Sequence, residues 1–227
     1  MRYSVLSAAI AFAALASSAT AFAEPATIII LRHGEKKDSK DLCTTGTLRA
    51  QALAEQFLGR NATQSLLPGN EKPAAILAIT PHTIETIEPA AETWNLKVQH
   101  SARDKNEPKD DDLDRLTREA AHDVLTNPAY NGKTVIMVWE HKRIASDEHN
   151  KAQTSLRELL HLGQAAKPPH EKWQGENYNF FWIVNYGPGN KVTVDATQHQ
   201  TFTGKKFAAL PDNGWNEAEQ NKGKDCE

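Results

Sequence analysis

Three segments of the chain are almost wholly apolar, and each predicts a buried strand. They cover Thr27–Leu31, Ala75–Thr80 and Thr134–Trp139. A strand that is buried on both faces loses the alternation of apolar and polar residues, so these three belong at the centre of a sheet. Long helical segments separate them along the chain, which is typical of parallel strands.

Amphipathic periodicity predicts the helices around this sheet. In the first helix, the apolar residues fall on one face, at Leu48, Ala52, Leu53 and Phe57. The predicted helices cover residues 44–58, a segment that begins near Thr83, residues 114–125 and residues 152–162. Phe180–Tyr186 and Val192–Ala196 flank a Gly-Pro-Gly-Asn turn and predict a hairpin that extends the sheet. The expected fold is α/β, a three-layer sandwich with a mostly parallel central sheet and helices on both faces.

Length and composition favour one domain behind a leader. The chain has 227 residues, of which 39% are hydrophobic and 24% charged, an ordinary globular balance. Residues 1–23 contain an early Arg2, an apolar run and a closing Ala21-Phe22-Ala23, which predicts a cleaved signal peptide, with a membrane anchor as the alternative. We therefore expect a secreted or periplasmic protein that leaves the membrane after cleavage. The predicted domain covers residues 24–202, followed by a polar, loosely ordered tail over residues 203–227.

Two further features of the composition concern partners and cross-links. The net charge is -3, so no global basic field attracts nucleic acid, and none is expected as a partner. The chain has two cysteines, Cys43 and Cys226. Export permits a disulfide, and we expect one that ties the tail to the domain, with two unpaired thiols as the alternative.

Three histidines follow the three predicted buried strands. His33, His82 and His141 each lie at the end of one of them. Since parallel strands end at the same edge of a sheet, we expect these side chains to converge there. Arg32 precedes His33, and Gly34 is expected to let the backbone turn sharply. A neutral imidazole can attack phosphorus while an arginine binds the phosphate oxygens, so the pattern predicts phosphoryl transfer through a phosphohistidine.

The residues around these strand ends resemble the histidine phosphatase superfamily, also called the phosphoglycerate mutase-like family. Its signature is present as Arg32-His33-Gly34-Glu35, and later family patterns resemble Thr45–Ala50 and Val138–His141. The resemblance implies a phosphoglycerate mutase-like fold. It also implies that His33 is the phosphorylated nucleophile, Arg32 a phosphate ligand and His141 the second histidine of the pocket.

The chain departs from the family at the position of the second arginine, and its proton donor is not assigned by the resemblance. The second arginine of the family corresponds to His82, which we expect to bind the substrate with a charge that depends on pH. The proton donor is unassigned: Glu107 and Asp110 are candidates from a charged loop, whereas Glu140 is expected to point to the other face if its strand continues. Glu35 is expected to be a structural partner of the neighbouring loop, and the acidic run 110–114 to be a solvated loop.

The function predicted from these residues is an exported phosphomonoesterase of the histidine acid phosphatase type. It would act on small phosphorylated substrates without a metal or another cofactor. One alternative is a catalytically weak or inactive relative that only binds phosphate ligands. The other alternative is a zinc hydrolase with His33, His82 and His141 as ligands, against which the fixed charge of Arg32 argues.

Overall fold

The structure is a computed structural model that describes residues 24–99, 109–189, 191–215, 217 and 225–226. The predicted signal peptide and Glu107 lie outside these residues. None of the described helices combines the length and the apolar character that crossing a bilayer requires.

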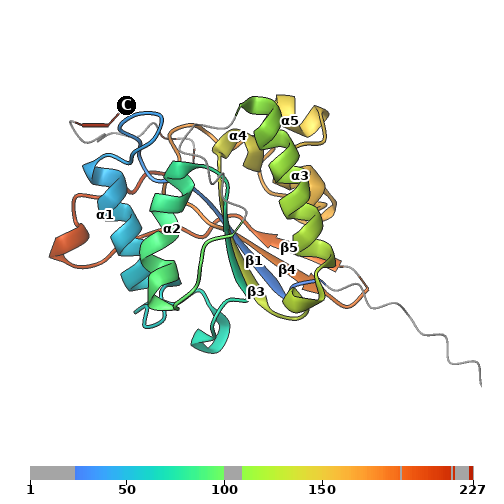
Figure 1. Cartoon of the computed structure of the whole chain (residues 1–227), viewed down its shortest axis with the longest axis horizontal. Helices are drawn as coiled ribbons and strands as arrows, with labels where there is room; N and C mark the ends of the chain where they lie inside the picture. The colour runs from blue at the N-terminus through green and yellow to red at the C-terminus, as the bar shows by residue number, and fades with distance from the viewer. Residues whose placement is uncertain (1–23, 100–108, 190, 216, 218–224, 227) are drawn as a thin grey trace, which may run out of the picture.

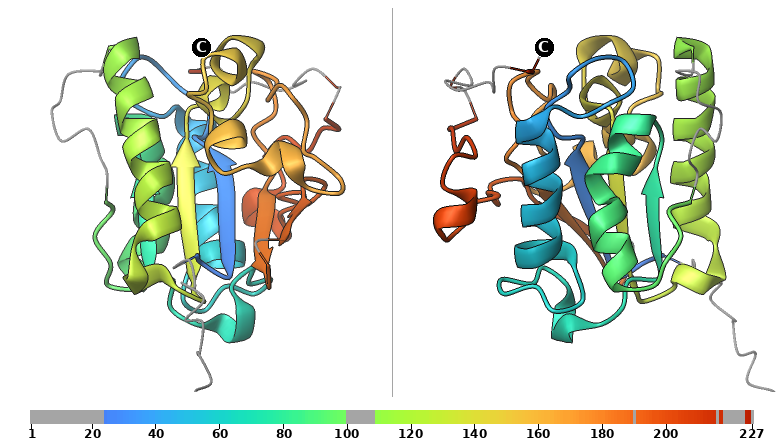
Figure 2. Two further views of the ribbon diagram at one scale, coloured as in Figure 1. Left: turned by 90° about the vertical axis from the view of Figure 1, so that its right-hand side faces the viewer. Right: turned by 60° about the vertical axis from the view of Figure 1, so that its left-hand side comes forward.

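The part of the chain that the structure describes contains five strands, which form one mixed sheet in the order β2-β3-β1-β4-β5. They are β1 (Thr27–Arg32), β2 (Ala75–Ala78), β3 (Thr134–Trp139), β4 (Trp182–Gly187) and β5 (Lys191–Asp195). The pairs β1/β3 and β2/β3 are parallel, as predicted, and the arrowheads of β1 and β3 point the same way in Figure 2, left. The predicted hairpin is β4 and β5, which pair antiparallel and join the sheet beside β1.

Six α-helices flank the sheet among the described residues. They are α1 (Thr44–Leu53), α2 (Pro81–Thr93), α3 (Asp110–Thr126), α4 (His141–Ile144), α5 (Asp147–Lys151) and α6 (Leu156–Leu159). A π-helical turn, Ala54–Leu58, continues α1 as far as Gly59, and 3-10 turns cover Pro68–Asn70, Pro128–Tyr130, Leu162–Gln164 and Lys205–Phe207.

The two faces of the sheet carry separate apolar cores. On β1, Ile28 and Ile30 pack in the core with residues of α3, whereas Ile29 and Leu31 pack in the core with residues of α2. Figure 1 shows α1 and α2 on one side of the sheet and α3 on the other. All four apolar side chains are fully buried, which is why the segment shows no alternation. The predicted three-layer α/β fold is confirmed.

Two helix predictions are wrong. The acidic run 110–114 is not a loop, because α3 begins at Asp110, with its acidic residues in the first turn. Acidic side chains favour a helix N-terminus, where they face the positive end of the helix dipole. The helix expected over residues 152–162 is reduced to α6, because Gln153 and His161 adopt positive φ angles of 55° and 58°.

The C-terminal segment is fastened to the domain. Cys43 and Cys226 form a disulfide, which confirms the predicted pairing. Part of the segment predicted as loosely ordered also packs on the domain, since Phe207 and Leu210 are buried in a small apolar cluster with Ala52. The Cys43 N–H donates to the Glu35 carbonyl at 3.0 Å, so the disulfide lies directly beside the segment that follows β1.

Candidate active site at the carboxyl edge of the sheet

The parallel register brings the predicted histidines together. Arg32 pairs with Trp139, and the His33 N–H donates to the Trp139 carbonyl at 3.3 Å, so the residues that follow β1 and β3 are neighbours. The ring centroid of His33 lies 5.7 Å from that of His82 and 6.4 Å from that of His141. The expected convergence is therefore present in the structure.

The side chain of His33 is fully buried, and its orientation is set by the backbone. Its Nδ1 lies 2.6 Å from the Gly34 carbonyl oxygen. A carbonyl oxygen can only accept, so Nδ1 must carry the proton, and Nε2 holds the lone pair when the ring is neutral. Burial lowers the pKa of His33 below its ordinary value, although the carboxylate of Glu140 acts in the opposite direction. A neutral ring in this tautomer directs its nucleophilic nitrogen at the neighbouring Arg32 and Glu140.

Arg32 presents its guanidinium to His33 from a buried position. Its Nη2 donates to His33 Nε2 at 3.2 Å, while Nη1 donates to the Gly175 carbonyl. The guanidinium carbon lies 3.7 Å from the ring centroid of Tyr178, which adds a cation–π contact. Gly175 and Tyr178 were not identified from the sequence, because they belong to an irregular segment that carries no periodic signal.

Glu140 is the site residue whose orientation was predicted wrongly from the sequence. Its Oε2 lies 3.3 Å from His33 Nε2, and its Oε1 accepts a 2.7 Å hydrogen bond from the Thr80 hydroxyl. The expectation that Glu140 points to the other face is wrong, because β3 ends at Trp139 and Glu140 is the N-cap of α4. Its position directly after the last strand residue, equivalent to His33 after β1, was the available signal.

Burial alone would raise the pKa of the Glu140 carboxyl. The positive charge of a protonated His33, the hydrogen bond from Thr80 and the charge of Lys36 act against burial and hold this pKa well below its ordinary value. Thr80 and Lys36 favour the ionised carboxylate also when the ring of His33 is neutral. The carboxylate and the Arg32 guanidinium thus place opposite charges next to His33 Nε2.

His141 is the first residue of α4 and faces the same site. Burial, followed by the charge of Arg32, lowers its pKa to about 2, so the ring is neutral at neutral pH. Among the described residues, its buried Nδ1 has no hydrogen-bond partner. A neutral imidazole with an unsatisfied nitrogen can offer a hydrogen bond to a phosphoryl oxygen.

His82 lies beside the site but directs its donor away from it. Thr80 caps α2 in a capping box with Thr83, which places His82 in the first turn, where its side chain is buried. His82 Nε2 donates to the Asp38 carbonyl at 2.8 Å, and Nδ1 lies 4.0 Å from Glu140 Oε1. A role of His82 in substrate binding stays a prediction.

Two buried contacts hold the segment after β1 against α1. Arg49 donates to the carboxylate of Glu35, with Nη2 to Oε1 at 2.6 Å and Nε to Oε2 at 3.0 Å. Gly34 does not have a positive φ angle, so the predicted sharp turn of the backbone does not explain why a glycine occupies this position. A Cβ on Gly34 would lie 3.1 Å from Cα of Gly46, and one on Gly46 would lie 2.1 Å from the Glu35 carbonyl oxygen. Both glycines therefore permit a close approach of two backbones.

Asp110, the described candidate for the proton donor, lies elsewhere. Its carboxylate contacts Nη2 of Arg143 at 3.1 Å, and its side chain is 93% exposed. Arg143 also binds Asp114. Asp114 lies 3.4 Å from Nδ1 of His149, which is buried. This cluster joins α3 to the segment after β3.

The geometry does not fit the predicted zinc site. Among the described residues, the potential ligand atoms that lie within 4.8 Å of one another belong to His33, Glu140 and His141, so the predicted ligand His82 is not part of the set. Nη2 of Arg32 lies 3.2 Å from His33 Nε2, the nitrogen that would bind the metal. A guanidinium at that distance disfavours a dication. The other such group contains Cys43 and Cys226, whose sulfurs form the disulfide.

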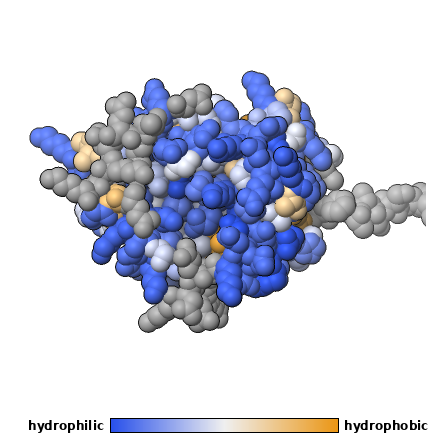
Figure 3. All heavy atoms as spheres, turned by 90° about the horizontal axis from the view of Figure 1, so that it is seen from above, coloured by the Kyte–Doolittle hydropathy of each residue, from blue (hydrophilic) through white to orange (hydrophobic). Residues whose placement is uncertain are grey.

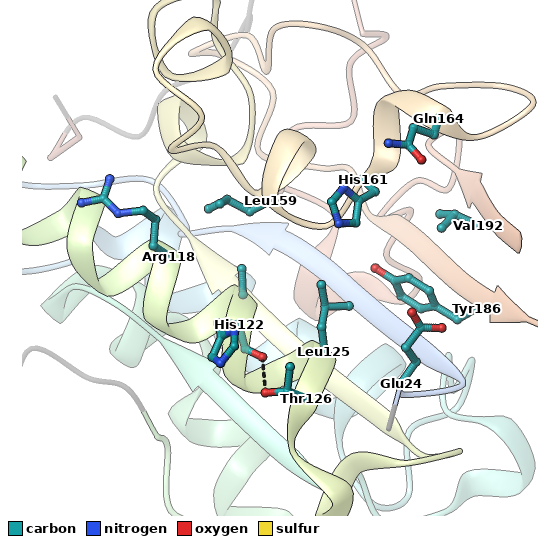
Figure 4. Close-up of a pocket in the computed structure, with 11 residues that line it drawn as sticks. Glu24, Arg118, His122, Leu125, Thr126, Leu159, His161, Gln164, Tyr186 and Val192 are labelled. Carbon is teal, nitrogen blue, oxygen red and sulfur yellow. Dashed lines mark hydrogen bonds between the residues drawn. The ribbon is translucent and has the colours of Figure 1, made fainter. Parts of the chain in front are cut away.

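A separate cavity of about 510 Å³ lies between α3, the segment around His161 and the hairpin (Figure 4). Its apolar lining includes Leu125 and Leu159, and Tyr186 donates its hydroxyl proton to the Leu160 carbonyl. None of its lining residues belongs to the group around His33. The cavity is therefore distinct from the candidate active site.

The end of the molecule at which β1 and β3 terminate is mostly hydrophilic. Figure 3 views it from above, and hydrophobic residues are few and scattered among the residues drawn in colour. A polar rim of this kind suits a charged small molecule better than a broad apolar partner.

No protein-family model and no curated protein matches the sequence. Among solved structures, the chain is similar to a mycobacterial glucosyl-3-phosphoglycerate phosphatase, with 14% identity and a TM-score of 0.44 over 75% of this chain and 97% of that one. The same phosphatase in complex with inorganic phosphate gives 14% identity and a TM-score of 0.43, covering 78% and 97%. A mycobacterial hydrolase gives 14% identity and a TM-score of 0.43, covering 78% and 99%. The resemblance to the histidine phosphatase superfamily rests on the motif from Arg32 to Glu35 and on the arrangement around His33.

Proposed function

We propose that the protein is an exported phosphomonoesterase that hydrolyses small phosphate esters through a phosphohistidine on His33. The observation that carries this proposal is the hydrogen bond from His33 Nδ1 to the Gly34 carbonyl, at 2.6 Å. It leaves Nε2 as the nucleophilic nitrogen, and Arg32 Nη2 lies beside it at 3.2 Å. A nucleophile and a permanent cation for the phosphate oxygens are thus adjacent.

The reaction has two steps. First, His33 Nε2 forms a bond to phosphorus while the bond from phosphorus to the ester oxygen breaks, and the alcohol leaves with a proton. A water molecule then attacks phosphorus, the N–P bond breaks, and phosphate leaves. Arg32 and the neutral ring of His141 would stabilise the phosphoryl oxygens in both steps, because such groups act most strongly on charge that is shared among the equatorial oxygens.

Two features support export. Residues 1–23 have the charged start, apolar centre and small closing residues of a signal peptide. The disulfide between Cys43 and Cys226 suits an oxidising compartment such as the periplasm or the exterior of the cell. Mass determination of the mature protein would test this part, and we expect it to begin at Glu24.

One observation favours a second candidate, a phosphate-binding protein without turnover. The carboxylate of Glu140 touches His33, and the Nε2–H donor of His82 is directed at Asp38, so Arg32 is the permanent cation next to His33. The carboxylate offsets the charge of this cation beside the nucleophile, so the site binds a dianion weakly at neutral pH. This candidate predicts phosphate binding, strongest in acid, with no release of alcohol from an ester.

Hydrolysis of p-nitrophenyl phosphate separates the two candidates. The phosphatase proposal expects steady turnover that a chelator does not reduce and that His33→Asn abolishes. The exposed His122 on α3 supplies a matched control, and His122→Asn should keep full activity. If the protein binds phosphate in calorimetry but releases no p-nitrophenol between acid and neutral pH, the binding candidate replaces the enzyme.

A further inference from the structure

The carboxylate of Glu140 covers the nitrogen that would attack phosphorus. Oε2 of Glu140 lies 3.3 Å from Nε2 of His33. His33 is 0% exposed, so a phosphoryl group that reaches Nε2 must take the place that the carboxylate now holds. Glu140 follows β3 rather than belonging to it, and its side chain is 16% exposed. The structure thus places Glu140 where rotation of its side chain would uncover Nε2 of His33 without movement of the strand.

One oxygen of this carboxylate is held while the other faces the reacting nitrogen. Oε1 accepts the 2.7 Å hydrogen bond from Thr80, which is itself fixed as the N-cap of α2. Oε2 has the contact with His33. A carboxylate that turned about its anchored oxygen would keep Oε2 near Nε2 of His33, where the oxygens bonded to phosphorus would lie. This is the position that a general acid requires.

The titratable and charged groups around Glu140 come from several elements that meet at this edge of the sheet. They are the rings of His33, His82 and His141, the guanidinium of Arg32 and the ammonium group of Lys36. When these imidazole rings are neutral, the positive charge of Arg32 and the negative charge of Glu140 offset each other beside Nε2 of His33. Addition of a phosphate ester then places negative charge beside the carboxylate, which favours its protonated form.

We propose that Glu140 carries the proton of the phosphatase reaction, as general acid in the first step and general base in the second. This inference rests on the proposed function. As the His33 Nε2–P bond forms and the ester P–O bond breaks, the Glu140 carboxyl gives its proton to the departing oxygen. The resulting carboxylate then takes a proton from the water that attacks phosphorus, the N–P bond breaks, and Glu140 is again a carboxylic acid.

Two substrates that differ in leaving group provide the test. An alkyl phosphate such as glycerol phosphate needs a proton on its departing oxygen, whereas p-nitrophenolate leaves without one. Glu140→Gln should lower kcat/KM, which reports only the first step, about 10²–10⁴-fold for the alkyl phosphate and by less than about tenfold for p-nitrophenyl phosphate. The matched control is Glu88→Gln, at an exposed glutamate of α2, which should change neither rate.

The outcomes separate the failure of this inference from that of the proposed function. If the wild-type protein hydrolyses neither substrate, the proposed function fails. If the wild type is active but Glu140→Gln lowers kcat/KM equally for both substrates, leaves both values unchanged or raises them, Glu140 is not the proton donor of the first step. An increase for both substrates would mean that the carboxylate only obstructs His33.

The pH dependence of the wild type supplies a second measurement, which does not depend on the folding of the variant. General acid catalysis by Glu140 predicts that kcat for glycerol phosphate falls on the alkaline side as the carboxyl of the bound complex loses its proton. For p-nitrophenyl phosphate the same limb should be absent or much shallower. Identical alkaline limbs for the two substrates would overturn the proposal.

Discussion

Arg49 and Glu35 form a buried salt bridge that joins α1 to the segment carrying the nucleophile. Nη2 of Arg49 lies 2.6 Å from Oε1 of Glu35, and the two side chains are 1% and 2% exposed. The resemblance identified both residues as part of family patterns, but their pairing follows only from the structure. Because both side chains are buried, water cannot solvate the charge that is left when one partner is removed. The position of His33 therefore depends on the intact ion pair.

Loss of one partner of this pair should be costly. Arg49→Met leaves the carboxylate of Glu35 buried without its cation, and we expect the free energy of unfolding to fall by about 3–5 kcal/mol. Urea denaturation monitored by tryptophan fluorescence measures this. Arg115 and Glu119 form an exposed pair on α3, so Arg115→Met is the matched control and should change stability little. Equal effects of the two substitutions would contradict the structural role given to Arg49.

The contact between Gly46 and the segment after β1 leaves no room for a methyl group. A Cβ at Gly46 would lie 2.1 Å from the Glu35 carbonyl oxygen and 2.9 Å from the Glu35 nitrogen. Gly46→Ala must therefore displace the backbone near His33, and we expect a loss of about 1–3 kcal/mol in stability together with reduced turnover. At Gly187 the nearest atom would be 3.7 Å away, so Gly187→Ala should be tolerated. Urea denaturation and p-nitrophenyl phosphate assays on both variants check this prediction.

The neutral state of His141 should make the folded protein sensitive to acid. Its pKa is about 2 when folded, against an ordinary value of 6.5, so between these values the unfolded chain binds the additional proton. Stability therefore rises with pH in this window and is lost as pH falls. The contribution is at most about 1.4 kcal/mol per pH unit, and less because the side chain is partly exposed.

Urea denaturation between about pH 7 and pH 5 measures this contribution without titrating most carboxylates. His141→Asn should show a smaller loss of stability over this range than the wild type. His122→Asn, at an exposed histidine of α3, is the control and should keep the wild-type dependence. A wild-type slope in His141→Asn would show that His141 is not held neutral by its surroundings.

The disulfide should stabilise the domain without taking part in the chemistry. Cys43 and Cys226 are separated by 183 positions, so the bond closes a long loop in the unfolded chain. Cys226→Ser should lower the free energy of unfolding by about 2–4 kcal/mol and leave phosphatase activity in place. Reductant should destabilise the wild type by a similar amount and should not affect Cys226→Ser further.

Much of the fold follows from the apolar strand pattern, because burial on both faces dictates the residue types of β1 and β3. The parallel pairing of β3 with β1 and with β2 then places His33, His82 and His141 at one edge of the sheet, as expected. Hydrophobic periodicity does not predict where the backbone conformation of a single residue ends a helix. Positive φ angles at Gln153 and His161 interrupt a helix that periodicity alone would continue.

The candidate site was only partly predictable for a related reason. If β3 continued through Glu140, the carboxylate would point to the other face. Because β3 ends one residue earlier, at Trp139, the carboxylate reaches His33. The partners of Arg32 come from Gly175 and Tyr178, in a segment without regular structure. Such contacts depend on tertiary packing, which no local pattern encodes.

Direct detection of a phosphoryl group on His33 tests the central claim. The protein is mixed with excess p-nitrophenyl phosphate, quenched in alkali because phosphohistidine is labile in acid, digested, and examined by mass spectrometry. We expect a phosphoryl group on His33 that acid treatment removes and that is absent from His33→Asn. Turnover without this adduct, or an adduct on His82 or His141 instead, would contradict the assignment of His33 as the nucleophile.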